Sequence, residues 1–351
     1  MGKILVTGGA GFIGSHVAEY FAKKGNEITV FDNLSRTRVL GKQIGDPHYN
    51  WNYLRKFNNI KFVRGDVRDF SQVKGAAKNS NVIIHAAAQV AVTISLSDPR
   101  IDFETNALGT FNVLEAARLN DSSMILCSTN KVYGENVNKI PVGEGQKRYY
   151  FKDDNFRSGI PEDFPIDLCS HSPYGCSKLV GDLYAQDYAE TFGLRAGVFR
   201  MSCIFGERQF GVEDQGWVAW FTIATLTGMP ITIYGDGKQV RDVLYVEDLV
   251  RAFDLFLSLG LKHEVFNMGG GPENVLSLLE LLSLLEELTG RKPKVSFDDW
   301  RPADQKVYVS DISKAKRKLG WGPKVAPREG VKRLVEWFAD SIDVWRKVYR
   351  K

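Results

Sequence analysis

The stretch Thr7-Gly8-Gly9-Ala10-Gly11-Phe12-Ile13-Gly14 lies between a short apolar run and a helical pattern. Glycine adopts a positive φ easily and lets a pyrophosphate approach the backbone, and the free N–H groups of a helix N-terminus favour the same anion. A glycine trio alone is a weak signal. Here Asp32 ends the next apolar run, 18 residues after Gly14, where a carboxylate can accept both ribose hydroxyls of an adenosine. The stretch therefore predicts a dinucleotide-binding turn.

Short apolar runs alternate with helical patterns through the first half of the chain. Near-continuous apolar runs are typical of strands in a parallel sheet covered on both faces. The predicted strands are residues 3–7, 27–31, 60–64, 81–85, 124–128 and 196–200, and the predicted helices include 13–24 and 107–119. We therefore predict an α/β fold with a doubly wound parallel sheet, whose ligands bind at the carboxyl ends of the strands.

The second half of the chain is less regular. It predicts a smaller α+β substrate lobe that interleaves with the sheet, from β-like segments at 231–234, 238–246 and 264–268 and a leucine-rich helix at 276–288. We expect residues 1–200 to form mainly the dinucleotide-binding domain and residues 201–351 mainly the substrate lobe, C-terminal helix included. The polar segments 36–59 and 136–172 are predicted to be loops with short helices.

The composition excludes several classes of protein. The 46 Lys and Arg against 42 Asp and Glu leave a net charge of +4, which does not predict binding to nucleic acid. The four cysteines contain no C-x-x-C pair and the five histidines no H-E-x-x-H, so neither a disulfide framework nor a metal site is expected.

Three stretches of the sequence bear on the cell compartment. The uncharged residues 215–235 indicate a buried helix, and residues 80–97 a buried strand that runs into a polar loop, rather than membrane spans. The glycines from Gly8 to Gly11 interrupt the apolar core that a secretory signal needs. We therefore expect a cytoplasmic protein without a membrane partner.

The residues around the glycine turn also bear on the choice of cofactor. Asp32 would repel a 2′-phosphate, which favours NAD over NADP, although Arg36 close behind it could accept such a phosphate. Asp66 and Val67, after the third strand, suit the adenine edge. The small residues Ala86, Ala87 and Ala88 follow the fourth strand, where the backbone must pass close to the cofactor.

A phenol and an ammonium stand four residues apart on a predicted helix, at Tyr174 and Lys178. A nearby cation and a positive nicotinamide ring favour phenolate, so we expect the pKa of Tyr174 to fall toward neutral pH and the phenol to act as a base. This spacing also occurs by chance on many helices. Thr129, at the end of the fifth strand, could hydrogen-bond the reacting oxygen or merely cap the strand. His171 is expected to be a loop residue rather than a second base.

These motifs together resemble the extended short-chain dehydrogenase/reductase family of NAD-dependent epimerases and dehydratases, which act on nucleotide-sugars. The resemblance covers almost the whole chain, through residues 241–248 and 319–323. It implies a Rossmann domain with tightly held NAD, a nucleotide-sugar-binding second lobe and a homodimer or homotetramer. It also implies the catalytic residues Thr129, Tyr174 and Lys178, with Tyr174 as base and Lys178 bridging the nicotinamide ribose and the tyrosine.

The cofactor-binding residues that the resemblance implies are Gly8, Gly11, Phe12, Ile13, Gly14, Asp32, Asn33, Ser35, Arg36, Asp66, Val67, Ala86, Ala87, Ala88, Gln89, Asn106, Ser128, Tyr174, Lys178 and Met201. The substrate-binding residues are Thr93, Asn130, Lys131, Ser202, Arg208, Gln209, Arg241 and Arg301.

The chemistry on the sugar is indicated by the residues that follow Thr129. Dehydratases of this family carry an Asp-Glu pair there, whereas this chain has Asn130 and Lys131, so elimination would lack its proton carriers. The stretches 128–134, 171–178, 199–210 and 214–218 resemble the branch that epimerises CDP-linked sugars at C2 through a transient 2-keto intermediate, the CDP-paratose/CDP-tyvelose type. This resemblance implies an isomerase. The alternatives are a UDP-sugar 4-epimerase or other nucleotide-sugar oxidoreductase of the family, and a non-catalytic NAD-binding scaffold.

The pyrophosphate of a CDP-sugar needs cations in the second lobe. Arg208, Arg241 and Arg301 are the candidates, because a guanidinium can bond two phosphate oxygens at once. The alternative is an ion pair of these arginines with Asp242 or Asp304. Cys203 stands where many relatives place an asparagine that touches the phosphate, which puts that contact in doubt. Trp217 and Trp220 are predicted to pack in a core more than to line the sugar pocket.

Overall fold

The chain divides into two units whose segments alternate along the sequence. The computed structural model describes residues 2–39, 48–301, 304–340, 342 and 345. The first unit comprises Met1–Val132, Ser172–Arg200 and Val250–Phe266, and the second comprises Tyr133–His171, Met201–Leu249 and Asn267–Lys351. Relative to the expected ranges of 1–200 and 201–351, residues 133–171 belong to the second unit and residues 250–266 to the first.

A seven-stranded sheet forms the centre of the first unit, in the order β12-β8-β5-β4-β1-β2-β3. Its strands are β1 (Lys3–Thr7), β2 (Glu27–Asp32), β3 (Ile60–Arg64), β4 (Val82–His85), β5 (Ser123–Thr129), β8 (Ala196–Met201) and β12 (His263–Met268). β1 pairs in parallel with both β2 and β4, so the strand order runs outward from β1 in two directions. This confirms the predicted doubly wound α/β fold and places its switch point, where such folds bind ligands, between β1 and β4.

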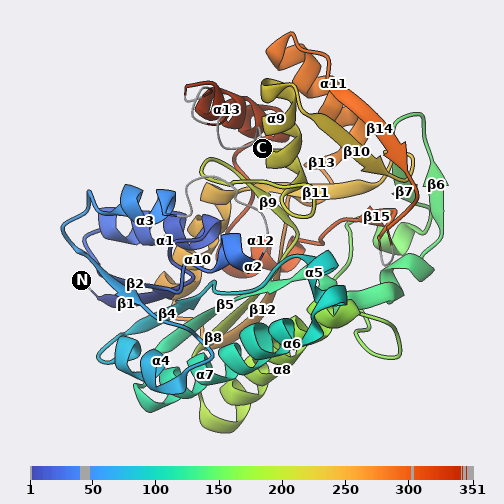
Figure 1. Ribbon diagram of the computed structural model, residues 1–351. Helices are drawn as coiled ribbons and strands as arrows, with labels where there is room; N and C mark the ends of the chain where they lie inside the picture. Colours follow the sequence, from blue (N-terminus) through green and yellow to red (C-terminus); the bar gives the residue numbers. More distant parts are fainter. Residues whose placement is uncertain (1, 40–47, 302–303, 341, 343–344, 346–351) are drawn as a thin grey trace. The chain divides into compact units, whose positions relative to one another are not determined.

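Helices cover both faces of this sheet (Figure 1). One face carries α4 (Phe70–Ala77), α7 (Gly109–Leu119) and α8 (Ser172–Phe192), and the other carries α1 (Phe12–Lys23), α3 (Tyr49–Leu54) and most of α10 (Val246–Ser258). An ion pair of 2.7 Å between Lys24 and Asp254 ties α1 to α10. Because both faces are covered, β5 is buried at every residue, as its apolar run predicts.

The remaining elements of the first unit are short, and several of them lie beside the carboxyl ends of the strands. They are α2 (Arg36–Val39), α5 (Val92–Ser97), α6 (Pro99–Asp102) and the π-helical turn η1 (Phe103–Leu108), which continues into α7. A π-helical turn of this kind occurs frequently at functional sites.

The second unit contains three smaller sheets. Its largest sheet joins β9 (Cys203–Phe205), β11 (Val240–Tyr245), β13 (Val275–Ser277) and β15 (Val307–Tyr308). The two pairs are β10 (Pro230–Tyr234) with β14 (Lys294–Asp298), and β6 (Val142–Glu144) with β7 (Tyr149–Phe151). Its helices are α9 (Trp217–Thr227), α11 (Leu278–Thr289), α12 (Ser313–Leu319), α13 (Pro327–Ala339) and the 3-10 segments η2 (Asn130–Lys139), which begins in the first unit, and η3 (Asp154–Phe156).

The uncharged stretch 215–235 forms α9, a largely buried helix that packs against α11 and α13 and ends at Gly228 with φ +75°. This confirms the prediction of a buried helix there. Among the described residues, none of the helices combines the length and the apolar character that crossing a membrane would require.

Three predicted segments differ from the structure. Residues 264–268, expected in the second lobe, lie in β12 of the seven-stranded sheet, and those up to Phe266, which packs on Phe199 of β8, belong to the first unit. The polar loop expected after β4 contains the helix α5, in which Ser95 Oγ bonds the Val92 carbonyl oxygen. The expected loop 136–172 contains the β6–β7 hairpin, and residues 40–47 of the other expected loop lie outside the described residues.

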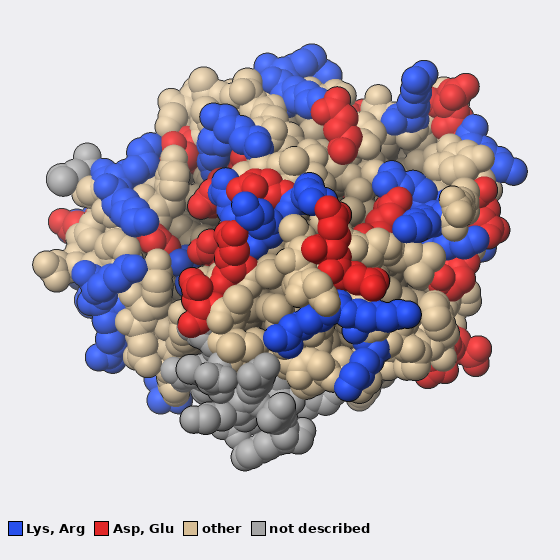
Figure 2. Space-filling model, turned by 90° about the horizontal axis from the view of Figure 1, so that it is seen from above, with Lys and Arg blue, Asp and Glu red and all other residues tan. Residues whose placement is uncertain are grey.

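Basic and acidic side chains are interspersed over the face of the molecule that Figure 2 shows, and neither sign forms a continuous field there. This agrees with the small net charge of +4.

Candidate active site

The glycine turn between β1 and α1 is tight and has no room for side chains at two positions. Gly8 has φ +68°, and a Cβ on it would lie 2.5 Å from the Ala87 nitrogen. A Cβ on Gly14 would lie 2.1 Å from the Gly8 carbonyl oxygen. Gly11 is the N-cap of α1 and supplies no side-chain acceptor to the N–H groups of Phe12 and its neighbours. The turn therefore fits the pyrophosphate of a dinucleotide.

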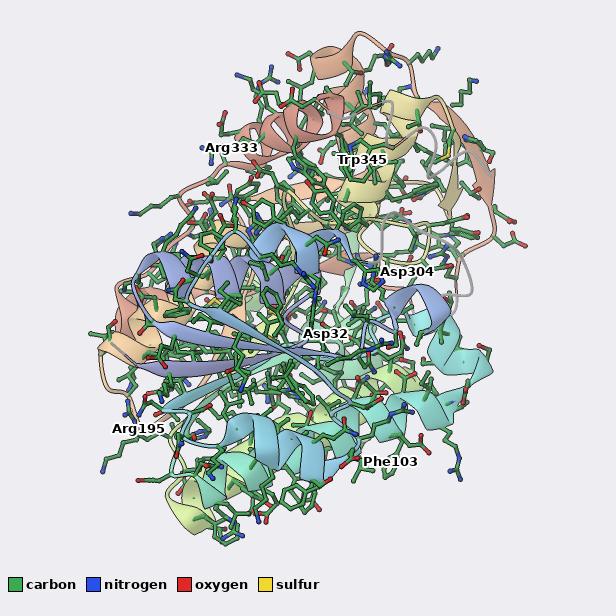
Figure 3. All side chains as sticks on the ribbon, turned by 60° about the vertical axis from the view of Figure 1, so that its left-hand side comes forward. Asp32, Phe103, Arg195, Asp304, Arg333 and Trp345 are labelled. Atoms are coloured by element: carbon green, nitrogen blue, oxygen red, sulfur yellow. The ribbon has the colours of Figure 1, made fainter. Side chains whose placement is uncertain are left out.

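Asp32 ends β2 beside this turn (Figure 3). Its Oδ2 accepts a 2.9 Å hydrogen bond from the Ala10 N–H, and its Oδ1 accepts one of 2.8 Å from the Leu34 N–H. Burial raises the pKa of Asp32, and the two N–H groups oppose that rise. Both oxygens are held in place and keep further lone pairs, which fits the ribose of an adenosine. Arg36 is exposed at the start of α2.

Asp66 and Val67, predicted for the adenine edge, follow β3 and lie beside the predicted cofactor residue Asn33, which follows β2. Asn33 donates to Asp66 at 3.0 Å and accepts from the Ser35 N–H at 3.0 Å. The Arg68 guanidinium lowers the pKa of Asp66 to about 2, against the opposing effect of burial. Val67 is buried. The hydrogen bonds give this edge a defined shape before any ligand binds.

The small residues after β4 pass beside the glycine turn. The Ala86 N–H donates to the Thr7 carbonyl oxygen at 3.0 Å. Ala87 lies against Gly8, and Ala88 is half-buried. Larger side chains at these positions would fill the space beside the turn.

Gln89 and Asn106, both predicted to bind the cofactor, bond each other. The Gln89 N–H donates to Asn106 Oδ1 at 2.8 Å, and Asn106 Nδ2 donates to the Gln89 carbonyl oxygen at 2.9 Å. Both residues are buried. These bonds hold the segment after β4 against the π-helical turn η1.

The three predicted catalytic residues lie close to one another, on α8 and at the end of β5. Tyr174 and Lys178 are both buried on α8, and Thr129 hydrogen-bonds the Tyr174 hydroxyl. Lys178 Nζ donates to the Cys127 carbonyl oxygen at 2.6 Å. Burial lowers the pKa of Lys178, and the Cys127 and Asp182 side chains oppose that effect.

The expected fall in the pKa of Tyr174 is not produced by the protein's own groups. Burial raises that pKa to about 12, and the hydrogen bond from Thr129 only partly opposes the rise. The prediction relied on Lys178 together with a positive nicotinamide ring, and the Lys178 ammonium group is bonded to the Cys127 carbonyl. In the protein alone, the phenol of Tyr174 is therefore protonated at neutral pH.

A buried ion pair fixes the strands around these residues. Asp182 of α8 and Arg200 of β8 are 2.9 Å apart, with side chains 0% and 4% exposed. Ser128 Oγ, predicted to bind the cofactor, donates to Asp182 Oδ2 at 2.6 Å. One carboxylate thus joins the carboxyl end of β5 to α8 and β8.

Asn50 was missed by the sequence reasoning. It lies on α3 with its amide nitrogen 3.4 Å from the Gly11 carbonyl oxygen and is 5% exposed. Its Oδ1 is buried and has no hydrogen-bond partner among the described residues. The local sequence around it is polar and without periodicity, so no motif marks it.

The predicted substrate-binding residues are divided between the units. Thr93 is exposed on α5, and Asn130 is buried and Lys131 half-buried after β5, in the first unit. Met201, predicted for the cofactor, and Ser202 belong to the second unit, where Ser202 Oγ donates to Asp242 Oδ1 at 2.5 Å.

The three predicted arginines lie in the second unit. Arg241 is 2.7 Å from Asp304 and also bonds the Gln305 carbonyl oxygen, so the ion-pair alternative is confirmed at this position. Arg301 lies 3.3 Å from Asp214, and its guanidinium carbon is 3.8 Å from the centre of the Tyr234 ring.

Arg208 differs from the other two arginines in being almost fully buried, at 4% exposed, with φ +61°. The neighbouring Gln209 Nε2 donates to the Ile204 carbonyl oxygen at 3.2 Å.

Cys203 and the two tryptophans form part of the same unit. The Trp217 indole N–H donates to the Cys203 sulfur at 3.3 Å, and the Trp217 ring packs edge-on against Phe221. Trp217 and Trp220 are both half-buried. His171 lies in a loop, as predicted.

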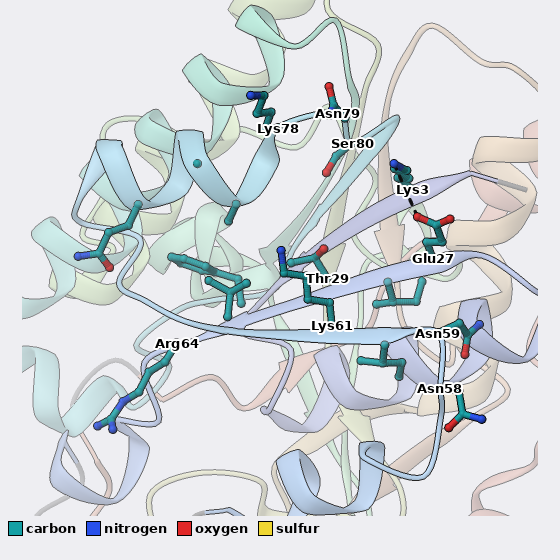
Figure 4. A pocket seen from close by; sticks show the side chains of 17 residues that line it. Lys3, Glu27, Thr29, Asn58, Asn59, Lys61, Arg64, Lys78, Asn79 and Ser80 are labelled. Carbon is teal, nitrogen blue, oxygen red and sulfur yellow. Dashed lines mark ion pairs between the residues drawn. The ribbon is translucent and has the colours of Figure 1, made fainter.

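A pocket of about 910 Å³ lies in the first unit, along the edge strand β3 and beside α4 (Figure 4). It is lined by the first residues of three strands, Lys3, Glu27 and Ile60, and Lys3 pairs with Glu27 at 3.7 Å. None of the predicted cofactor or catalytic residues lines it. The lining also includes Phe31, Val63 and Arg64 near the carboxyl ends of β2 and β3, but it does not include the glycine turn or Asp32, so this pocket is not the candidate cofactor site.

The chain matches the family model described as "NAD dependent epimerase/dehydratase family" over residues 4–269. It is 40% identical to CDP-paratose 2-epimerase of Salmonella typhi over 348 residues, which cover 95% of this chain and 98% of that protein. It is 31% identical to UDP-glucuronate 4-epimerase of Thermodesulfobacterium geofontis, over 99% of each chain. Among solved structures, UDP-glucose 4-epimerase of Thermus thermophilus in complex with NAD is similar, with a TM-score of 0.78, 32% identity and coverage of 96% of this chain and 99% of that one.

Proposed function

The chain belongs to the NAD-dependent epimerase/dehydratase family, and from this premise we propose that it is an isomerase that inverts C2 of a CDP-linked sugar, of the CDP-paratose or CDP-tyvelose type, with tightly bound NAD. The observation that carries the proposal is the 40% identity to CDP-paratose 2-epimerase across 95% of the chain, together with the buried group of Thr129, Tyr174 and Lys178. Asn130 and Lys131 support epimerisation over dehydration, because they replace the Asp-Glu pair that carries the protons in dehydratases of this family.

The chain's own residues would manage the proton of the sugar hydroxyl. Tyr174 would take the proton from the C2 hydroxyl and later return it, and Thr129 would hydrogen-bond the same oxygen. The glycine turn and Asp32 would hold NAD, whose bound nicotinamide would supply reversible hydride transfer at C2. Because the pKa of Tyr174 is about 12 in the protein alone, the phenol would lose its proton only when a positive charge is bound beside it.

We assign the diphosphate of the substrate to Arg208, Arg241 and Arg301. Arg241 and Arg301 are held by carboxylates and carbonyl oxygens of the second unit, and Arg208 is buried. An arginine that is already immobilised loses little side-chain entropy when it binds an anion. This supports a diphosphate site in spite of the ion pairs.

The test of the function is a product analysis. Purified protein, without added NAD, is incubated separately with CDP-paratose, CDP-tyvelose, CDP-glucose, UDP-glucose and UDP-glucuronate, and the products are analysed by NMR. We expect interconversion of CDP-paratose and CDP-tyvelose. Inversion at C4 of a UDP-sugar without any C2 product would contradict the proposal and favour the 4-epimerase alternative. If none of these sugars is converted although NAD is bound, the result would favour a non-catalytic NAD-binding scaffold.

We propose a homodimer that pairs the outer faces of α7 and α8. Phe103, labelled in Figure 3, is 60% exposed beside α7, and Leu183 of α8 is 46% exposed. Phe111 and Tyr184 extend this apolar face, with their rings in edge-to-face contact. Exposed apolar patches of this kind mark protein–protein contacts.

Leu183→Glu is expected to convert the dimer to a single chain of 39.4 kDa, because a carboxylate would be buried in an apolar contact. Light scattering after gel filtration measures the mass. Leu259→Glu is the matched control, since Leu259 is 52% exposed and lies outside α7 and α8. An unchanged mass for Leu183→Glu would place the contact elsewhere.

The four cysteines are free thiols. Free thiols suit a reducing compartment, and the proposal therefore includes the cytoplasm as the site of action.

A further inference from the structure

Asp102 is a buried carboxyl group for which the proposed mechanism has no use. It ends α6 and is 0% exposed. Gln89 Nε2 donates to its Oδ2 at 2.9 Å, and Asn106 Nδ2 lies 3.4 Å from its Oδ1. A carboxyl group buried in this way costs free energy when it ionises. Burial accordingly raises the pKa of Asp102 to about 6, with a further contribution from Asp98.

A chain of hydrogen bonds leads from Asp102 to the first turns of α8. Asn106 Nδ2 donates to Ser177 Oγ at 3.0 Å, and Ser177 Oγ donates to the Tyr174 carbonyl oxygen at 2.8 Å. Gln89 belongs to the same network, because its backbone N–H and its carbonyl oxygen both bond the Asn106 side chain. The members come from α6, η1 and α8 and are all buried. The backbone position of Tyr174 is therefore tied to Asp102.

The charge of Asp102 also reaches the Tyr174 side chain. Its carboxylate adds to the rise in the pKa of Tyr174 that burial causes, whereas Thr129 opposes that rise. A phenolate and a carboxylate repel each other, so the ionised Asp102 favours the protonated phenol.

The charged groups of the other elements packed against α6 have partners of their own. On α8, the buried Lys178 donates to the Cys127 carbonyl oxygen and the buried Asp182 is paired with Arg200. α5 contains no ionisable residue. Glu104 of η1 is engaged with Arg68 and Arg100. Asp98, on the loop that leads into α6, is exposed and caps the helix by accepting from the Ile101 N–H. Asp102 is thus the carboxylate that acts on the phenol.

We propose that Asp102 is a positioning residue for Tyr174, which holds the start of α8 through Asn106 and Ser177 and whose negative charge sets the lowest pH at which the phenol can act as a base. This inference rests on one part of the proposed function, the assignment of Tyr174 as the base. Above about pH 6 Asp102 is ionised and the phenol keeps its proton more firmly. The carboxylate thereby limits proton loss from Tyr174 before the ligands are bound.

The test uses Asp102→Asn, which removes the negative charge of the side chain and keeps its shape. The protein as purified, with its bound cofactor, is labelled with ¹³Cζ-tyrosine, and the Tyr174 signal is assigned from its absence in Tyr174→Phe. We expect the titration midpoint of Tyr174 to fall by about one pH unit, because the negative charge that disfavours the phenolate is removed. The acid limb of the pH profile of kcat, measured with CDP-paratose, is expected to shift by the same amount.

Glu104→Gln is the matched control, because it removes a carboxylate two residues away that is engaged with arginines, and it is expected to leave the midpoint unchanged. A midpoint in Asp102→Asn within about 0.2 unit of the original would overturn the proposal and leave Asp102 with a structural role only, even if the melting temperature falls. A Tyr174 signal that does not titrate below about pH 10.5 in either protein would overturn it as well.

A second variant and a measurement without sugar keep the test decisive. If Asp102→Asn does not fold, Asp102→Ser removes the same charge and has the same expected shift. The NMR titration requires no sugar, so its outcome stands whether or not the chain turns over CDP-paratose. Failure of the proposed function and failure of this inference are therefore distinguished.

Discussion

Tyr174→Phe is expected to lower kcat by about 10² or more, because it removes the acid–base group that would exchange a proton with the sugar hydroxyl. The substitution deletes one oxygen from a side chain that is 7% exposed and leaves the ring in place. Thr129 loses its bond to the phenol but keeps those to Asn130 and Lys131, so we expect a small loss of stability, on the order of 1 kcal/mol. The amount of bound NAD is expected to be unchanged.

The measurement combines steady-state turnover of CDP-paratose with the quantity of NAD released from the denatured protein. Tyr184→Phe is the matched control, since Tyr184 lies on the same helix and is 44% exposed, and its turnover is expected to be normal. Unchanged turnover in Tyr174→Phe would mean that the tyrosine is not the base. A variant that cannot fold would indicate a structural role instead.

Gly14→Ala is expected to abolish tight binding of NAD. The added Cβ would lie 2.1 Å from the Gly8 carbonyl oxygen and 2.8 Å from both the Gly8 carbonyl carbon and the Gly9 Cα. All three are backbone atoms of the glycine turn, so the turn itself must move to admit the methyl group. We expect at least a tenfold weaker affinity for NAD, equivalent to about 1.4 kcal/mol. The overpacking should also cost about 1–3 kcal/mol of stability.

The affinity is measured by titrating NAD into cofactor-free protein, and the stability by denaturant unfolding of the same sample. Gly75→Ala, in α4, is the matched control, because nothing lies within 4 Å of a Cβ at that glycine. It is expected to bind NAD normally and to gain about 0.5–1 kcal/mol from helix propensity. Retention of normal NAD affinity in Gly14→Ala would show that the pyrophosphate does not depend on this turn.

The sequence predicts those parts of the fold whose signals are local. β1 and β3 match the expected strands. β1 is buried from Ile4 to Thr7, as its apolar run predicts, whereas β3 is an edge strand of which only Ile60 is buried. The turn from Gly8 to Gly14 and the position of Asp32 are also local, since backbone geometry demands the glycines. The pattern could not place residues 264–268, because pairing of β12 beside β8 depends on contacts between segments more than 60 residues apart.

The site residues divide in the same way. The spacing of Tyr174 and Lys178 correctly placed both on one buried helix, but their electrostatics depend on burial and on the Cys127 carbonyl, which the spacing does not reveal. The bond from Asn106 to Ser177 joins residues 71 positions apart, and the pair of Arg241 with Asp304 joins residues 63 apart. Contacts at such separations have no signature in a single sequence.

The alternation of the two units along the chain has a consequence for synthesis. The sheet of the first unit has β12, from residues 263–268, as its last strand, while residues 133–171 and 201–249 belong to the second unit. Because the ribosome synthesises the chain from its N-terminus, about half of the second unit is made before β12 is available to pair with β8. Until then the edge of β8 is an unpaired strand edge, which is open to pairing with a strand of another nascent chain.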